Sequence, residues 1–377
     1  MLGPLVLSLA MALAPPRSES DKRRSDIIAA HADWQTARGS GDRIRALGAA
    51  RRLVAAAPEN PVLRTFLAMG AAGAGDLDLA RETPEWLAAR GYGVSDRAGA
   101  DLGSMLGEAR HARLARRLAA NAAPRGSHLA LVQVGGGARS EGVTYDTRRD
   151  RVYLANGDGL FAVRRDGSAE PVVAADALRD RFVLGVRYDA AHDRVFVCSS
   201  SRPGAQNPTA ELVVLHPAEP ARVERFELGP SSQQRLCNDI AVLTDGAAVT
   251  DTNTGEVLRY RDGHGVSRLT ETRFTYPNGV VQVGDQIIVA DLLGLWALAP
   301  DGRLLGQMRT VGGDYLGGMD GLAASGDTLI GVQNLSAPGR VVSFRAAGGL
   351  LLRDRRVLIA GAPELDGMTT ATVRGDR

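Results

Sequence analysis

The stretch PNGVVQVGDQIIVAD, residues 277–291, contains the pattern that decides the fold. The polar pair Asn278-Gly279 precedes a short apolar strand, a Gly-Asp turn follows, and the β-branched run 286–289 forms a second strand. Short strands of this kind, bounded by Gly, Asp and Asn, recur from Leu129 onward. The pattern predicts a β-rich domain assembled from small repeated sheets.

The Asn278-Gly279 pair is one of six such pairs, here called anchors, each followed directly by an apolar residue. Successive anchors lie 40 to 54 residues apart, which is the spacing of propeller blades with four strands each. We therefore expect a six-bladed β-propeller whose last blade is incomplete, with the strand 128–134 contributing to its closure. The anchors are Glu141-Gly142, Leu184-Gly185, Asn238-Asp239, Asn278-Gly279, Asp320-Gly321 and Asp366-Gly367.

The chain before residue 125 has a different composition, dominated by alanine and arginine, with apolar residues at three- and four-residue spacing. Breaks at Pro58-x-x-Pro61 and at Gly75-Asp76 separate helices of about 12 to 14 residues. This pattern resembles one and a half to two tetratricopeptide-type repeats, and a generic helical cap is the alternative. The expected domains are a signal-like segment 1–20, a helical domain 21–125 and a propeller 126–377.

The first residues include an apolar run, 2–14, that is too short to span a bilayer and fits the core of a secretory signal. It predicts a periplasmic or secreted protein, although no basic residue precedes the run, and a mis-chosen start is the alternative. In an exported protein Cys198 and Cys237 could pair; otherwise each is a small buried apolar side chain. The net charge of +2 gives no sign of a nucleic-acid partner.

The first residues of the anchors are expected to converge on the propeller axis, because the innermost strands of all blades line it. Five of these six residues carry side-chain oxygens, and carboxylate and amide oxygens are the ligands that calcium prefers. Histidine and cysteine are missing from the anchors, which disfavours zinc and copper. The alternative is that the pairs are turn dipeptides. The predicted ligands are Glu141, Asn238, Asn278 and Asp320, and Asp366 could add a third carboxylate.

Four of the anchor segments, in their order and spacing, resemble the gluconolactonase and regucalcin family of six-bladed propellers, relatives of the paraoxonases. The resemblance covers residues 129–377 and implies that Glu141, Asn278 and Asp320 bind the metal, with Asp320 as general base. It places Asn238 at the metal or at the substrate. The segments are Ser140-Glu141-Gly142-Val143, Asn238-Asp239-Ile240-Ala241-Val242, Tyr276-Pro277-Asn278-Gly279-Val280 and Met319-Asp320-Gly321-Leu322-Ala323.

The sequence departs from the family at two places. The second anchor is Leu184-Gly185, without the histidine pair of paraoxonases. The position at which the family often has a substrate-binding arginine is Leu236, so the neighbouring Arg235 becomes the candidate. Tyr315, in a glycine-rich loop before the fifth anchor, is a second candidate for substrate contact.

The favoured function is a calcium-dependent hydrolase of the lactonase or esterase class, acting on a small lactone or ester at the central channel. A metal can polarise a lactone carbonyl, and a neighbouring carboxylate can accept a proton. The alternatives are a non-catalytic propeller with a structural ion, binding a protein partner through its helical segment, and a different metal-dependent reaction on the same fold. No membrane span is expected.

Overall fold

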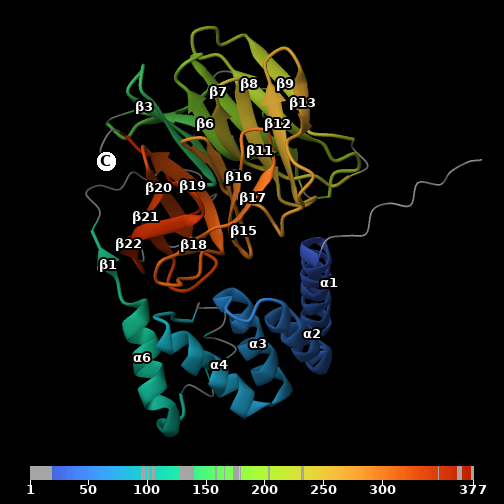
Figure 1. The fold of residues 1–377 in the computed structure, drawn as a ribbon, viewed down its shortest axis with the longest axis vertical. Helices are drawn as coiled ribbons and strands as arrows, with labels where there is room; N and C mark the ends of the chain where they lie inside the picture. The colour runs from blue at the N-terminus through green and yellow to red at the C-terminus, as the bar shows by residue number, and fades with distance from the viewer. Residues whose placement is uncertain are drawn as a thin grey trace, which may run out of the picture.

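The structure is a computed structural model in which an all-α module and a β-propeller lie side by side (Figure 1). The ranges that it describes are residues 19–94, 99, 102–103, 107–127, 140–157, 159–164, 166–172, 178, 180–202, 204–230, 233–346, 348–362 and 367–374. Residues 1–18 of the signal-like segment, the expected closing strand 128–134 and Asp366 therefore lie outside the described residues, while residues 19 and 20 begin the first helix.

The helical module begins and ends its helices at the residues that the sequence marks as breaks. Asp42, Asn60 and Asp76 are N-caps whose side chains accept hydrogen bonds from backbone N–H groups of the first helical turns. Gly75 ends a helix with φ of 79°, a left-handed conformation that glycine adopts without steric cost. The helices are α1 (Glu19–Ser40), α2 (Arg43–Ala56), α3 (Pro61–Ala74), α4 (Leu77–Ala89) and α6 (Ala112–Ala122), with a 3-10 turn at Ala109–His111.

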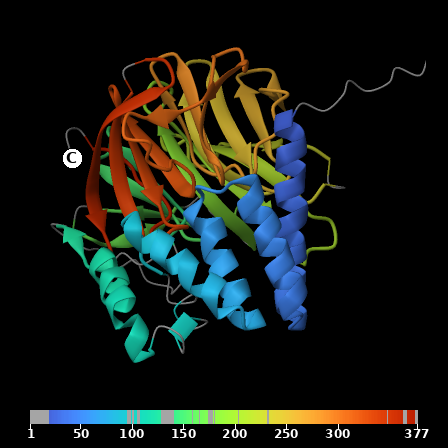
Figure 2. The ribbon, with the colours of Figure 1, turned by 60° about the horizontal axis from the view of Figure 1, so that its bottom comes forward.

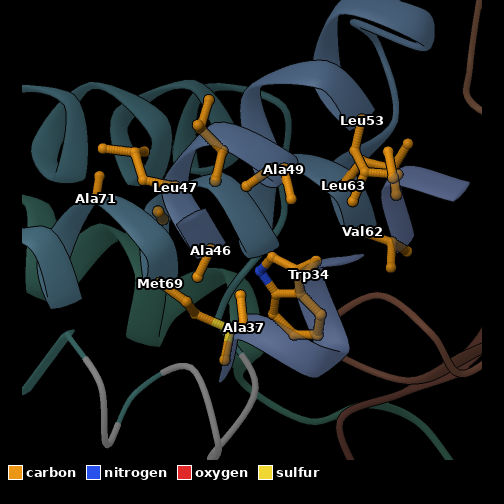
Figure 3. Packing of buried hydrophobic residues seen from close by; sticks show 14 of the residues in the cluster. Trp34, Ala37, Ala46, Leu47, Ala49, Leu53, Val62, Leu63, Met69 and Ala71 are labelled. Carbon is orange, nitrogen blue, oxygen red and sulfur yellow. The ribbon is translucent and has the colours of Figure 1, made fainter. Parts of the chain in front are cut away.

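The core of this module is built largely from small side chains, which lets the helices pack closely. Figure 3 shows Trp34 of α1 beside the alanines of α2, with Leu53 and Leu63 meeting between α2 and α3. Trp34 also stacks on Phe66, with ring centroids 4.1 Å apart. These aromatic rings supply the apolar area that the many alanines cannot.

In the described part of the chain the propeller has five sheets, or blades, each built on four antiparallel strands that follow one another in sequence order. The blades are β2 (Gly142–Asp146), β3 (Arg151–Ala155), β4 (Leu160–Val163) and β5 (Ala169–Pro171); β6 (Arg181–Asp189), β7 (Arg194–Ser201), β8 (Ala210–Leu215) and β9 (Val223–Glu227); β10 (Cys237–Leu243), β11 (Gly246–Asp251), β12 (Glu256–Arg261) and β13 (Gly265–Arg268); β14 (Val280–Val283), β15 (Gln286–Asp291), β16 (Gly294–Leu298) and β17 (Leu304–Gln307); and β19 (Met319–Ser325), β20 (Thr328–Gln333), β21 (Arg340–Ala346) and β22 (Leu351–Ala360). Two short strands, β1 (Arg125–Gly126) and β18 (Arg309–Thr310), pair with β22.

The expectation of six blades is wrong, because the described residues form five. The described stretch after β22 comprises residues 361–362 and 367–374. Its residues 367–374 contain no strand but lie between blades five and one. Thr369 Oγ1 donates a hydrogen bond to the Ser140 carbonyl at 2.6 Å, and Arg374 pairs with Asp150. Among the described residues, Gly367 of the sixth anchor therefore belongs to a segment between blades five and one and not to a strand.

Neighbouring blades pack face to face through apolar clusters. Blades two and three share a cluster that includes Phe196, Leu212 and Val249, and similar clusters fill the spaces between blades one and two, three and four, and four and five. Cys198 of β7 and Cys237 of β10 form a disulfide within the cluster of blades two and three. The sequence left this pairing open, and the fold brings the two residues to adjacent blades.

The helical module packs against one side of the propeller (Figure 2). Asn60 makes the central contact: its Oδ1 caps α3, while its Nδ2 donates to the Leu292 carbonyl at 3.1 Å. His31 Nδ1 lies 3.1 Å from the hydroxyl of Tyr276. Leu292 itself belongs to the helical core. One buried asparagine thus caps a helix and also fixes the position of that helix on blade four.

Candidate metal centre at the propeller axis

The anchors lie where the innermost strands come closest together. A Cβ added at the second residue of three anchors would approach the carbonyl oxygen of the next anchor to within 2.3 to 2.7 Å. None of these three glycines has a positive φ, so close backbone approach, not a turn, requires glycine here. The contacts are Gly142 with Leu184, Gly185 with Asn238, and Gly279 with Asp320.

Asp320 is the carboxylate around which the predicted site is arranged. Its Oδ2 accepts a hydrogen bond from Asn334 Nδ2, and the Asn278 side chain donates a second. Burial, together with the charges of Glu141 and Asp239, raises the pKa of Asp320 to about 7, against the two amide hydrogen bonds. The structure therefore brings Glu141, Asn278 and Asp320 into one electrostatic environment.

Two buried oxygens beside Asp320 have no hydrogen-bond partner among the described residues. They are Asn334 Oδ1 and Thr370 Oγ1. Unpartnered buried acceptors are uncommon, because each forfeits the hydrogen bonds that water would give it. No ion pair joins Asp320 to a cation within the described ranges. An oxygen-rich site with an unneutralised carboxylate fits a hard divalent cation such as calcium.

Asn334 is a site residue that the sequence reasoning missed. It directly follows β20, whose last residue Gln333 pairs with Met319, and its side chain reaches diagonally across this pair to Asp320. The Nδ2 group of Asn334 also donates to the Met368 carbonyl at 2.8 Å. Asn334 therefore links Asp320 of the fifth anchor to the segment 367–374. The signal that could have found Asn334 is its position directly after the second strand of a blade.

Asn238 lies next to this group but is held by a different partner. Its Nδ2 donates to Thr252 Oγ1 at 2.8 Å, and that hydroxyl donates to the Pro277 carbonyl at 2.7 Å. The amide oxygen of Asn238 is not used in this chain of bonds. The second anchor contributes Leu184, which is buried in the core between blades two and three.

A buried ion pair lies between the innermost strands, one residue after the Asn238 position. Arg187 of β6 lies 3.2 Å from Asp239 of β10. Arg187 also donates to the Val143 carbonyl at 3.1 Å and to the Leu322 carbonyl at 2.8 Å, while Asp239 accepts from the Val280 N–H. The pair therefore connects the innermost strands of all five blades. Neither residue was predicted to have this role, although Asp239 is the second residue of an anchor.

Arg235 and Tyr315, the two predicted substrate contacts, lie away from Asp320 in the fold. The Arg235 guanidinium is buried and bonds Asp251 at 2.8 Å and Glu256 at 2.5 Å. The Tyr315 hydroxyl donates to the Leu292 carbonyl, where the helical module meets blade four. Tyr315 lines a cavity of about 790 Å³, which does not reach Asp320.

The helical module packs on the face of the propeller at which the anchors gather. Asn278 stands directly after Tyr276-Pro277, and Tyr276 contacts His31 of α1. A Cβ on Gly318, two residues before Asp320, would lie 3.5 Å from the Val62 side chain of α3. A molecule that reaches Asp320 from this side must pass the helical module.

Within the described ranges, no three residues among His, Cys, Asp and Glu gather closely enough to hold a metal by themselves. The predicted set contains two such residues, Glu141 and Asp320, and depends on amide oxygens for the rest. The helices of the described residues include none with the length and apolar character of a bilayer span.

No protein-family model matches this chain, and no curated protein matches it in sequence. Solved structures with a related fold include a nidogen/laminin complex, with 17% identity, a TM-score of 0.43 and coverage of 60% of this chain and 82% of the other. A glucose dehydrogenase has 11% identity, a TM-score of 0.42 and coverage of 59% and 87%. The soluble aldose sugar dehydrogenase of Escherichia coli has 9% identity, a TM-score of 0.42 and coverage of 59% and 86%. Likenesses this distant carry no argument about activity, and the class that the blades define is the β-propeller.

Proposed function

We propose that the anchors bind one divalent cation, calcium by the nature of the oxygens, and that the protein is a metal-dependent hydrolase of the lactonase or esterase class. The observation that carries this proposal is the setting of Asp320, a carboxylate without a cationic partner among the described residues, bonded by Asn278 and Asn334 and facing the charge of Glu141. Such a site favours a cation of charge two.

The proposed reaction is the addition of water to a lactone carbonyl, followed by cleavage of the ring C–O bond. When bound, the cation would polarise the carbonyl oxygen. Asp320 would accept a proton from the attacking water and return it to the departing alkoxide. Asn334 would orient Asp320 through its amide, and Asn278 would assist it.

The alternative is a binding or scaffold propeller with a structural cation. Two observations favour it: the helical module packs on the face where the anchors gather, and the Arg187–Asp239 pair closes the axis beneath Asp320. In that case the cation would hold the inner strands together, and the helical module would be the surface for a protein partner.

The test compares wild type with Asp320→Asn and with Asp285→Asn, a matched change at the exposed turn between β14 and β15. Lactone and aryl-ester hydrolysis is measured with calcium and after chelation. We expect calcium-dependent turnover in wild type and Asp285→Asn, and a loss of at least about a hundredfold in Asp320→Asn.

Turnover that survives both chelation and Asp320→Asn would contradict the hydrolase proposal. A calcium-dependent rise in melting temperature without turnover would instead select the structural ion. The disulfide and the signal-like segment support assaying the protein in the oxidised form that an exported protein would have.

A further inference from the structure

The helical module and blades four and five line a solvent-open cavity of about 790 Å³ between them. This volume falls in the range of small-molecule sites, which often form where domains meet. The charge of its lining is strongly unbalanced, since six arginines face two carboxylates, Glu59 and Asp314. The arginines are Arg23, Arg90, Arg125, Arg309, Arg340 and Arg355.

Arg340, the first residue of β21, is the most informative of these side chains. The residue is only 6% exposed, and its Nε and Nη2 atoms are buried without a hydrogen-bond partner among the described residues. Its guanidinium lies over the Tyr92 ring, 4.7 Å from the centroid. A cation–π contact of this kind attracts the charge but leaves the N–H groups without acceptors.

The other deeply buried arginines of the propeller differ from Arg340 in one respect. Arg194 binds Asp189 and Asp262, Arg235 binds Asp251 and Glu256, and Arg187 binds Asp239; these pairs neutralise each guanidinium within the fold. No ion pair to Arg340 exists within the described ranges. An isolated buried charge is costly, so an arginine kept in this state indicates an anion supplied from outside.

The surroundings of Arg340 increase this need for an anion. The charges of Arg355 and Arg125 act with burial to lower the pKa of Arg340, opposed by Asp314 and Tyr92. Asp314 is itself engaged: it lies 3.7 Å from Arg355 and 3.3 Å from the Thr310 hydroxyl. Asp314, the carboxylate whose charge acts on Arg340, is therefore already engaged by Arg355 and the Thr310 hydroxyl.

We propose that this cavity binds a phosphorylated small molecule, with its phosphate group held by Arg340 and the neighbouring arginines. Guanidinium groups bind phosphate through paired N–H bonds, and several of them match its charge of about −2. The volume exceeds what inorganic phosphate needs, and the half-buried Leu293 and Val357 in the lining offer apolar surface to the organic part. Because the arginines come from both modules, the ligand would fasten the helical module to the propeller.

The test uses inorganic phosphate, and glycerol phosphate against glycerol, at constant ionic strength set with sodium chloride. Melting temperature and calorimetric titration are followed in wild type, Arg340→Met and Arg309→Ala. The matched control is Arg345→Met, on the same strand β21 but exposed and paired with Asp327. We expect phosphate and glycerol phosphate to raise the melting temperature of wild type and control, and glycerol to leave it unchanged.

Arg340→Met is expected to bind the phosphate group at least about tenfold more weakly, the loss of a charge-assisted pair. Without ligand its melting temperature should equal or exceed that of wild type, because an unpaired buried charge has been removed. Arg309→Ala, at an exposed lining position, gives an independent reading if Arg340→Met does not fold. Equal stabilisation of all variants by phosphate, or none beyond that of chloride, would overturn the proposal.

Discussion

Two ionisable side chains of opposite type, Asp320 at the propeller axis and Arg340 at the module interface, are both without an ion-pair partner among the described residues. The axis just beneath Asp320 is different, because Arg187 and Asp239 neutralise each other there. The comparison teaches that the fold pairs a buried charge with an opposite one where the charge serves structure alone. The places where it does not are the places where a ligand is expected: a cation at Asp320 and an anion at Arg340.

The largest effect is expected when one partner of the neutralised axial pair is removed. Arg187→Met leaves Asp239 buried without its partner, so the free energy of unfolding should fall by about 3 to 5 kcal/mol. Urea denaturation of wild type and variant measures the difference. Arg345→Met, which breaks an exposed pair with Asp327, should change it by less than about 1 kcal/mol.

The double variant Arg187→Met with Asp239→Asn should recover part of the loss, because the unpaired charge is then gone. If the single variant lost no more stability than Arg345→Met, the axial pair would not be a structural device. The contrast with Asp320 and Arg340 would then have no basis.

A smaller effect is expected for a neutralised pair at the rim between blades one and two. Arg149 donates two hydrogen bonds of 2.7 Å to Asp193, and together with the Tyr188 hydroxyl they hold the pKa of Asp193 well below its usual range. A carboxylate with a lowered pKa stabilises the fold above its unfolded pKa of about 3.9, and this contribution is lost as the pH falls below that value.

Asp193→Asn should therefore cost about 1 kcal/mol at neutral pH and nothing at a pH near the folded pKa. Chemical denaturation of wild type and variant between pH 7 and strongly acidic pH measures the convergence. Two curves separated by the same amount at every pH would show that packing, not charge, accounts for the effect.

The sequence predicted those parts of the fold that depend on local pattern. The helix breaks at Pro58-x-x-Pro61 and Gly75-Asp76 are where the structure ends and begins its helices. The anchors predicted the positions of the inner strands, because glycine is required where one inner strand passes close to the next. They gave one blade more than the described residues form, because an anchor carries no information about the strands outside it.

The candidate site was less accessible to sequence reasoning. Asp320 stood out as a polar residue at a repeated position, but Asn334 reaches it only through a side-chain contact across the pairing of β19 and β20. Arg340 could not be distinguished from other arginines by pattern, since what sets it apart is the lack of a partner after folding. Arg235 shows the converse, an arginine chosen by its neighbourhood in sequence that the fold pairs with Asp251 and Glu256.

The most direct test of the account is a calorimetric titration of calcium into chelator-treated wild type, Asp320→Asn and Asp285→Asn. The account predicts one ion per chain in wild type and in Asp285→Asn, and binding at least about tenfold weaker in Asp320→Asn, because one of the anionic oxygens is lost. Equal binding in all three, or none in wild type, would contradict it.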